Sequence, residues 1–213
     1  MRTSLRWACL ILAFTGGLLV QVVRYQSDQL ARLQSRVDPH VDVLAELQDE
    51  LEATRVELAV RNVLDANRIN VPANKKRAIA NSIIEVGQRY ELPPDLILAI
   101  IFTESRFDVA AESEKGAIGL MQLMPATASA LADELEVEWK GQQLLIDPEI
   151  NILLGSFYLR QLLHRFNDLS TALAAYNVGP TKLRDLLLKR GHLPQRYSTQ
   201  VERVRDSLLR DHF

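Results

Sequence analysis

The feature that most constrains the fold is an apolar segment, residues 96–102, that ends close to a single glutamate, Glu104. The segment reads Leu-Ile-Leu-Ala-Ile-Ile-Phe and leaves no polar face on a helix, so a helix formed by it has to be buried on all sides. Glu104 emerges where this helix reaches the surface. Partial desolvation disfavours an ionised carboxylate, and we expect it to raise the pKa of Glu104. The sequence therefore predicts a bundle built around a carboxyl group that can act as an acid.

Proline and glycine positions divide the rest of the C-terminal region into further helices. Pro125, Pro148 and Pro180 each stand where a first helical turn tolerates proline. Asp168 and Gly179 are typical of the start and the end of the helix between them. No stretch alternates apolar and polar residues for long enough to require a strand, so the predicted fold class is all-α. We expect helices over residues 74–90, 125–135, 148–166, 169–178, 180–189 and 199–209.

The N-terminal region contains a candidate membrane segment, residues 5–23. Its uncharged run, Trp7 to Val23, is near the lower limit of the roughly 17–25 residues that span a bilayer. No small-x-small cleavage site follows the run, and Cys9 stands at its start, whereas a lipoprotein signal would place the cysteine after it. We expect residues 1–24 to be an uncleaved signal anchor that crosses a bacterial inner membrane once and leaves the rest of the chain in the periplasm. The alternative is a buried soluble helix.

Residues 25–71 are charged and helix-prone and are predicted to form a stalk. Pro39 interrupts them, because proline removes a helical hydrogen bond, so we expect the helix to run from about residue 42 to residue 67. The stalk either self-associates as a short coiled coil or packs its leucine stripe on the chain's own globular domain, residues 72–213. The heptad positions are Leu30, Val37, Leu44, Leu51 and Leu58, with Leu33 and Leu47 at the complementary position.

Composition and residue spacing argue against a nucleic-acid partner, a disulfide and a cofactor. The formal net charge of −2 favours no polyanion, so nucleic acid is not an expected partner. One cysteine allows no intramolecular disulfide. The four histidines have no metal-ligand spacing, and no glycine-rich phosphate loop is present, so no metal or other cofactor is expected.

Three ordered motifs indicate a family. Glu104-Ser105 is followed at residues 116–128 by Gly-x-x-Gly-Leu-Met-Gln-Leu-Met-Pro-x-Thr-Ala, and then at residues 172–180 by Ala-Leu-Ala-Ala-Tyr-Asn-x-Gly-Pro. Together they resemble the catalytic domain of soluble-type lytic transglycosylases, relatives of goose-type lysozyme. The resemblance covers roughly residues 76–190 and implies a lysozyme-like helical arrangement.

The resemblance also implies roles for single residues. Most glycosidases use two carboxylates, but lytic transglycosylases use one glutamate, first as acid and then as base, and Glu104 matches it. The nearest other acids, Asp108, Glu112 and Glu114, belong to none of the motifs. Ser105 is either a hydrogen-bonding neighbour of the acid or a simple polar helix end. The positions that match substrate-contacting residues are Ser105, Gly119, Met121, Gln122, Tyr176 and Asn177.

The C-terminal block departs from the family pattern, which closes with Glu-Thr-x-x-Tyr-Val-x-x-Val after a proline. Here Arg196-Tyr197 stands at Glu-Thr, and Gln200 stands where the tyrosine is usual. We expect Tyr197, one helical turn earlier, to replace that second cleft tyrosine.

Two classes of function are compatible with these residues. The first is a membrane-anchored lytic transglycosylase that cleaves the β-1,4 MurNAc–GlcNAc bond of peptidoglycan and forms 1,6-anhydroMurNAc; a lysozyme-type hydrolase is its variant with water as nucleophile. The second is a glycan-binding scaffold of an envelope complex that barely cuts. The intact motifs around Glu104 favour the enzyme, and the altered C-terminal block is the argument for the scaffold.

Overall fold

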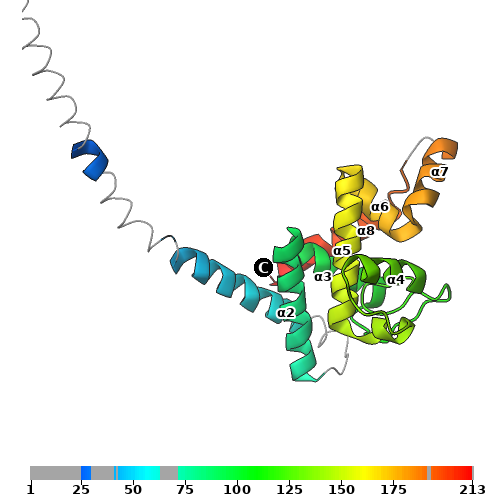
Figure 1. Cartoon of the computed structure of the whole chain (residues 1–213), viewed down its shortest axis with the longest axis horizontal. Helices are drawn as coiled ribbons and strands as arrows, with labels where there is room; N and C mark the ends of the chain where they lie inside the picture. The colour runs from blue at the N-terminus through cyan, green and yellow to red at the C-terminus, as the bar shows by residue number, and fades with distance from the viewer. Residues whose placement is uncertain (1–24, 30–40, 42, 63–71, 191–192, 213) are drawn as a thin grey trace, which may run out of the picture. The chain divides into compact units, whose positions relative to one another are not determined.

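The computed structural model describes residues 25–29, 41, 43–62, 72–190 and 193–212 (Figure 1). The expected anchor, residues 1–24, and most of residues 30–42 and 63–71 of the expected stalk lie outside the described residues. None of the helices within the described residues is long and apolar enough to cross a membrane. The chain divides into two compact units, Met1–Leu51 and Glu52–Phe213.

The described residues of the first unit are helical, at residues 25–29, 41 and 43–51. Three leucines of the predicted heptad pattern are among the described residues of this unit, and each has more than half of its surface exposed. They are Leu44 (60%), Leu47 (55%) and Leu51 (51%).

The second unit is helical in its described residues, which confirms the all-α fold class. Its loops contain isolated bridges, Glu112 with Ile118 and Ile118 with Leu123, but no named strand. The elements are α2 (Ala73–Tyr90), α3 (Pro94–Ser105), α4 (Pro125–Glu134), the 3-10 helix η1 (Gln142–Ile146), α5 (Pro148–Phe166), α6 (Leu169–Val178), α7 (Pro180–Arg190) and α8 (Arg196–His212).

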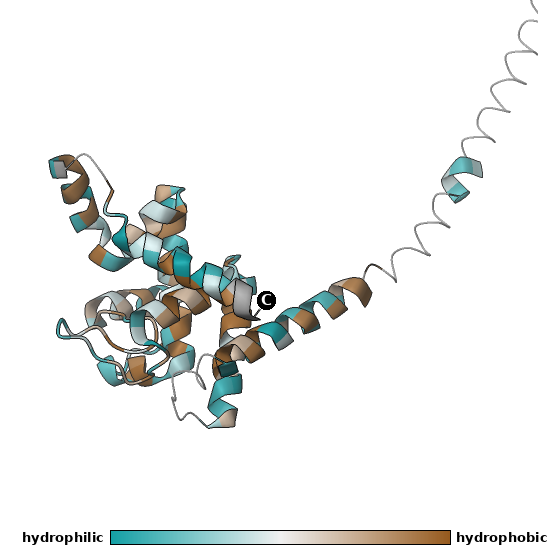
Figure 2. Cartoon of the chain, turned by 180° about the vertical axis from the view of Figure 1, so that it is seen from behind, coloured by the Kyte–Doolittle hydropathy of each residue, from teal (hydrophilic) through white to brown (hydrophobic). Residues whose placement is uncertain are grey.

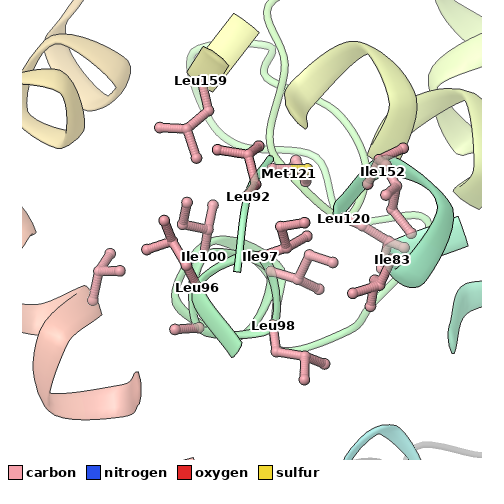
Figure 3. Packing of buried hydrophobic residues seen from close by; sticks show 14 of the residues in the cluster. Ile83, Leu92, Leu96, Ile97, Leu98, Ile100, Leu120, Met121, Ile152 and Leu159 are labelled. Carbon is pink, nitrogen blue, oxygen red and sulfur yellow. The ribbon is translucent and has the colours of Figure 1, made fainter. Parts of the chain in front are cut away.

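Helix α3 is the centre of the second unit, as its sequence predicts. Residues 96–101 are at most 2% exposed, and only Phe102 of the apolar run is partly exposed. The helix packs against α8 and α2 (Figure 1). Figure 3 shows its side chains leaving the helix in several directions, toward Ile83 and Ile152 on one side and toward Leu159 on another. A helix without a polar face is thus enclosed by neighbours, which is what removes its end from water.

The end of the stalk helix also belongs to the second unit. Val56, Ala59 and Val60 are fully buried members of the main core cluster. Leu58, on the stripe predicted to pack, remains 45% exposed. Residues 56, 59 and 60 share one side of a helix, and Leu58 lies on another. The leucine stripe therefore does not cover the core at this position, and the compact unit begins before residue 72.

One helix boundary, the start of α8, bears on the site. Helix α8 begins at Arg196 rather than at residue 199, because the Ser198 hydroxyl donates to the Gln195 carbonyl (3.0 Å) and the Thr199 N–H bonds to the same oxygen (2.9 Å). Tyr197 thus lies in the first turn of a helix. The outer helices are amphipathic: Figure 2 shows hydrophilic and hydrophobic residues alternating along α2 and α8.

Candidate active site

Glu104 stands in the last turn of α3 and is partly buried. The hydroxyl of Tyr197 donates a hydrogen bond to its Oε1 at 2.5 Å. The two residues come from α3 and α8, which are far apart in sequence, so the contact exists only in the folded unit. It places Tyr197, one helical turn before Gln200, beside the carboxyl.

Burial raises the pKa of Glu104 to about 7, and the hydrogen bond from Tyr197 acts in the opposite direction. Removal from water penalises the ionised carboxylate, whereas a donated hydrogen bond favours it. The predicted direction of the shift is confirmed. A carboxyl with this pKa is present in both protonation states at neutral pH, so it can give a proton in one step and accept one in the next.

The backbone turns sharply directly after the carboxyl. Arg106 and Phe107 both have positive φ, 52° and 63°, a conformation that bulky residues rarely adopt. Phe107 is fully buried, and its ring anchors the turn in the core. The turn ends α3 at Ser105, so Glu104 stays at the rim of the bundle.

The loop of residues 111–123, between α3 and α4, is held in place by Asn151 of α5. The Asn151 side chain accepts from the Met121 N–H (2.7 Å) and donates to the carbonyls of Ile118 and Leu145 (3.0 Å each). Gly119 sits against this amide with φ 83°, and a Cβ atom there would lie 2.3 Å from Asn151 Nδ2. Only glycine fits this approach.

Met121 and Gln122 both serve the loop itself. Met121 is fully buried, and its sulfur lies against Gly155, where an added Cβ would come within 2.5 Å. It has no exposed surface for a sugar, unlike the contact that the resemblance implies. Gln122 has φ 50°, and its amide nitrogen donates to the carbonyls of Ala111 and Gly119 (3.0 Å each). Its amide hydrogens are thus used inside the loop.

Tyr176 connects this loop to the neighbourhood of the acid. Its hydroxyl donates to the Met121 carbonyl at 2.9 Å, and its ring lies 5.4 Å from that of Tyr158. Burial, followed by the charge of Glu104, raises the pKa of Tyr176 well above its ordinary value. The pKa of Tyr197 is raised well above its ordinary value by the same two causes. Both tyrosines therefore remain neutral hydroxyl donors at physiological pH.

Within the described structure, the other two predicted residues, Ser105 and Asn177, form no hydrogen bond with the Glu104 carboxyl. The Ser105 hydroxyl donates to the Ile101 carbonyl (3.1 Å), one turn back on its own helix, which is the bonding of a polar helix end. Asn177 is exposed in the last turn of α6.

The described residues offer Glu104 no second acid. No other carboxylate contributes to the raised pKa of Glu104. Glu112 and Glu114 are exposed, and Asp108 accepts from the Ala110 N–H (3.0 Å) within its own loop. In the part of the chain that the structure describes, no three His, Cys, Asp or Glu side chains come together as metal ligands.

Asn151 is the residue that sequence reasoning missed. It makes three hydrogen bonds, yet it belongs to none of the motifs. A signal was present: Asn151 precedes Ile152 in the apolar part of a predicted helix, and an amide at a core position needs partners. The partners themselves come from a loop whose path the sequence did not reveal.

Glu104, Tyr176 and Tyr197 all lie within a region that matches a known family. The family described as "Transglycosylase SLT domain" matches residues 81–198. A transglycosylase of Enterobacteria phage PRD1 is 42% identical over 91 residues, which is 43% of this chain and 31% of that protein. The soluble lytic murein transglycosylase of Escherichia coli K12 is 36% identical over 99 residues, 46% of this chain and 15% of that protein.

A membrane-bound relative matches over a longer range. The membrane-bound lytic murein transglycosylase C of Haemophilus influenzae (strain PittEE) is 33% identical over 181 residues, 76% of this chain and 48% of that protein. Among solved structures, the 70 kDa soluble lytic transglycosylase of Escherichia coli superposes with a TM-score of 0.52 at 29% identity, covering 59% of this chain and 24% of that one. This chain spans less than half the length of each of these relatives.

Proposed function

Because the chain belongs to the transglycosylase SLT family, we propose that it is a peptidoglycan lytic transglycosylase in which Glu104 acts first as acid and then as base. The observation that carries this proposal is a single carboxyl with a pKa of about 7, hydrogen-bonded by Tyr197 and without a second carboxylate acting on it among the described residues. One group that is easily protonated and easily ionised suits a reaction with two opposite proton transfers.

The proposed reaction consumes no water. Glu104 gives its proton to the glycosidic oxygen, and the bond between MurNAc C1 and that oxygen breaks, which releases GlcNAc with a free 4-hydroxyl. Positive charge develops at C1, as in other glycosidases. The ionised Glu104 then takes the proton of the MurNAc 6-hydroxyl, and the oxygen of that hydroxyl bonds to C1. The product is 1,6-anhydroMurNAc, and Glu104 is protonated again.

The tyrosines support the ionised stage of this cycle. The Tyr197 hydroxyl donates to Glu104 Oε1, so it stabilises the carboxylate that exists between the two proton transfers. Tyr176 lies close enough for the charge of Glu104 to act on its hydroxyl, and we assign it to the same wall of the site. We assign Ser105, Gln122 and Asn177, which are not buried, to the proposed substrate region. Gly119 and Met121 are buried and shape the loop behind that region, and the Gln122 amide hydrogens are used within the loop.

Mass spectrometry of fragments released from purified sacculi tests the proposal, with Glu104→Gln as the control. The amide keeps the shape of the carboxyl but has no proton to give. Saccharide ends one water lighter than hydrolysis products, formed only with Glu104, are the expected result. Reducing ends would make the protein a hydrolase. Binding to sacculi without Glu104-dependent release would indicate the scaffold that the Gln200 departure favours.

We further propose that residues 1–24 anchor the protein in the inner membrane with the enzyme in the periplasm. The apolar run of residues 7–23 supports this, and a relative named as membrane-bound matches 76% of this chain. A reporter fused after Phe213 is expected to be active only outside the cytoplasm, and cytoplasmic activity would refute the orientation. The exposed leucines of residues 43–58 support self-association of the stalk or its docking in an envelope assembly.

A further inference from the structure

A second polar contact joins the two helices that meet at Glu104. Arg205 of α8 donates from Nε to the Oδ2 of Asp95, which stands in the first turn of α3. The Glu104–Tyr197 contact joins the last turn of α3 to the first turn of α8, whereas Arg205 stands near the middle of α8. The helices are therefore antiparallel, and the two contacts are about 12–14 Å apart along the axes at a rise of 1.5 Å per residue.

The Asp95–Arg205 pair is more enclosed than the other ion pairs of the described residues. The side chains of Asp95 and Arg205 are 13% and 29% exposed, whereas those of Glu91 and Arg160, which pair at 3.0 Å, are 78% and 43% exposed. A partly buried pair is less screened by water and salt than a surface pair. The pair can therefore hold a position that exposed pairs cannot hold.

Between the two polar contacts, α8 contributes the fully buried Val201 to the core, and beyond Arg205 it contributes Leu208, 6% exposed. Apolar contacts of this kind are non-directional, so the two polar contacts add a directional constraint on the position of α8 along α3. The Tyr197–Glu104 hydrogen bond is directional and weakens steeply away from its preferred geometry. Ser198, which accepts from the Ser170 hydroxyl at 3.0 Å, ties the start of α8 to α6 rather than to α3.

We propose that Asp95 and Arg205 are positioning residues: their ion pair fixes α8 along α3 and so holds the Tyr197 hydroxyl on Glu104. The inference rests on the proposed function only in naming Glu104 as the acid, since the contact itself belongs to the fold. Neither residue touches the carboxyl. They act on it through the nine residues of α8 from 197 to 205.

The consequence of losing the pair follows from the groups that face Glu104. These are Tyr197 on α8 and Tyr176 on α6, and only Tyr197 donates to the carboxylate. When α8 shifts, that hydrogen bond is lost while the apolar surroundings remain. The carboxylate is then less favoured, and the pKa of Glu104 rises.

A titration of Glu104 in the full-length protein tests this without an activity assay. We would label the glutamate carboxyls with ¹³C, follow their chemical shifts with pH, and assign Glu104 by its absence in Glu104→Gln. Arg205→Gln is the test variant, Arg205→Lys retains the charge, and Arg160→Gln removes an ion pair that touches neither α3 nor α8. Tyr197→Phe and the Arg205→Gln/Tyr197→Phe double variant complete the set.

We expect Arg205→Gln to raise the midpoint of Glu104 by about half a pH unit or more, in the direction of the Tyr197→Phe shift. Arg205→Lys should restore most of the wild-type value, and Arg160→Gln should leave it unchanged. The double variant should titrate like Tyr197→Phe alone, because both changes remove the same hydrogen bond.

Three results would overturn the inference. They are an unshifted Glu104 in a folded Arg205→Gln protein, an equal shift in Arg160→Gln, and shifts that add in the double variant. If the pair only stabilises the fold, Arg205→Gln lowers the melting temperature and leaves the titration of Glu104 unchanged. Absence of 1,6-anhydro products would count against the proposed function alone, because the titration needs no substrate.

Discussion

Replacing Tyr197 by phenylalanine removes one hydroxyl and leaves the ring in place. That hydroxyl donates to Glu104 Oε1 at 2.5 Å. A hydrogen bond to a charged group contributes roughly 1.5–3 kcal/mol, and one pKa unit corresponds to about 1.4 kcal/mol. The pKa of Glu104, about 7 in the intact protein, should therefore rise by about 1–2 units in Tyr197→Phe, because desolvation remains and the opposing hydrogen bond is gone.

The loss of the hydroxyl should change both the pH dependence of kcat/KM and the maximal rate. The free enzyme needs a protonated Glu104, so the alkaline limit of kcat/KM should move upward by the same 1–2 units or so. The maximal rate should fall by about tenfold to a hundredfold, since the carboxylate that forms in the first step loses its donor. The assay is the release of soluble fragments from sacculi between about pH 5 and pH 9, together with the ¹³C titration of Glu104.

Tyr90→Phe is the matched control. The Tyr90 hydroxyl is buried and has no hydrogen-bond partner in the described structure, so its removal should change neither the titration nor the rate. An unchanged or lowered pKa of Glu104 in Tyr197→Phe would refute the argument, because it would mean that the hydroxyl does not stabilise the carboxylate.

Three further outcomes are expected. Glu104→Gln should raise the free energy of unfolding at pH 8 but not at pH 4. The pKa of Glu104 in the folded state, about 7, lies above its ordinary value of 4.5, so the folded state holds the proton to higher pH than the unfolded state does. The stability of the unsubstituted protein therefore falls by up to about 3 kcal/mol as pH rises through this range, and the amide removes that loss. Denaturant titrations at both pH values check this, and an equal effect at each would contradict it. Gly119→Ala should lower the free energy of unfolding by roughly 3 kcal/mol or more, because the added Cβ would meet Asn151 and the Leu145 carbonyl. In the same measurement, Gly116→Ala should lower it by about 1–2 kcal/mol, because its Cβ would meet nothing within 4 Å and only the backbone is strained. A fragment of residues 72–213 should have a free energy of unfolding roughly 2–4 kcal/mol lower than that of a fragment of residues 52–213, because it lacks the buried Val56 and Val60. Denaturant titrations of the two fragments measure this difference. Equal stability would show that these side chains add nothing to the core.

The parts of the fold that the sequence predicted are those set by local chemistry. A run without a polar face has to be enclosed, and residues 96–101 are. Prolines and helix caps act within one turn, so the starts of α4, α5 and α7 fall at Pro125, Pro148 and Pro180 as expected.

The parts that were missed depend on contacts between distant segments. The leucine spacing of the stalk suggested a packing face, yet Val56, Ala59 and Val60 enter the core instead. Periodicity shows which residues share a side of a helix, not which side meets the rest of the protein. The start of α8 was placed too late because two bonds to one carbonyl of Gln195 extend the helix backward.

In the site, the direction of the Glu104 pKa shift was predictable from its position after a buried helix. The hydrogen bonds from the Gln122 amide to the Ala111 and Gly119 carbonyls were not predictable, because these groups become neighbours only when the loop closes. The Asn151 amide is the reason that the loop closes there, and an isolated asparagine in a helical pattern does not reveal its partners.

The acid and the hydroxyl that tunes it are separated by 93 positions in the chain. At ~5–20 residues per second, roughly 5–20 s pass between the synthesis of Glu104 and that of Tyr197. Until α8 has been made and has packed on α3, Glu104 lacks the Tyr197 hydroxyl that donates to it. Under the proposed function, the complete site therefore exists only after the C-terminal segment has left the ribosome and folded.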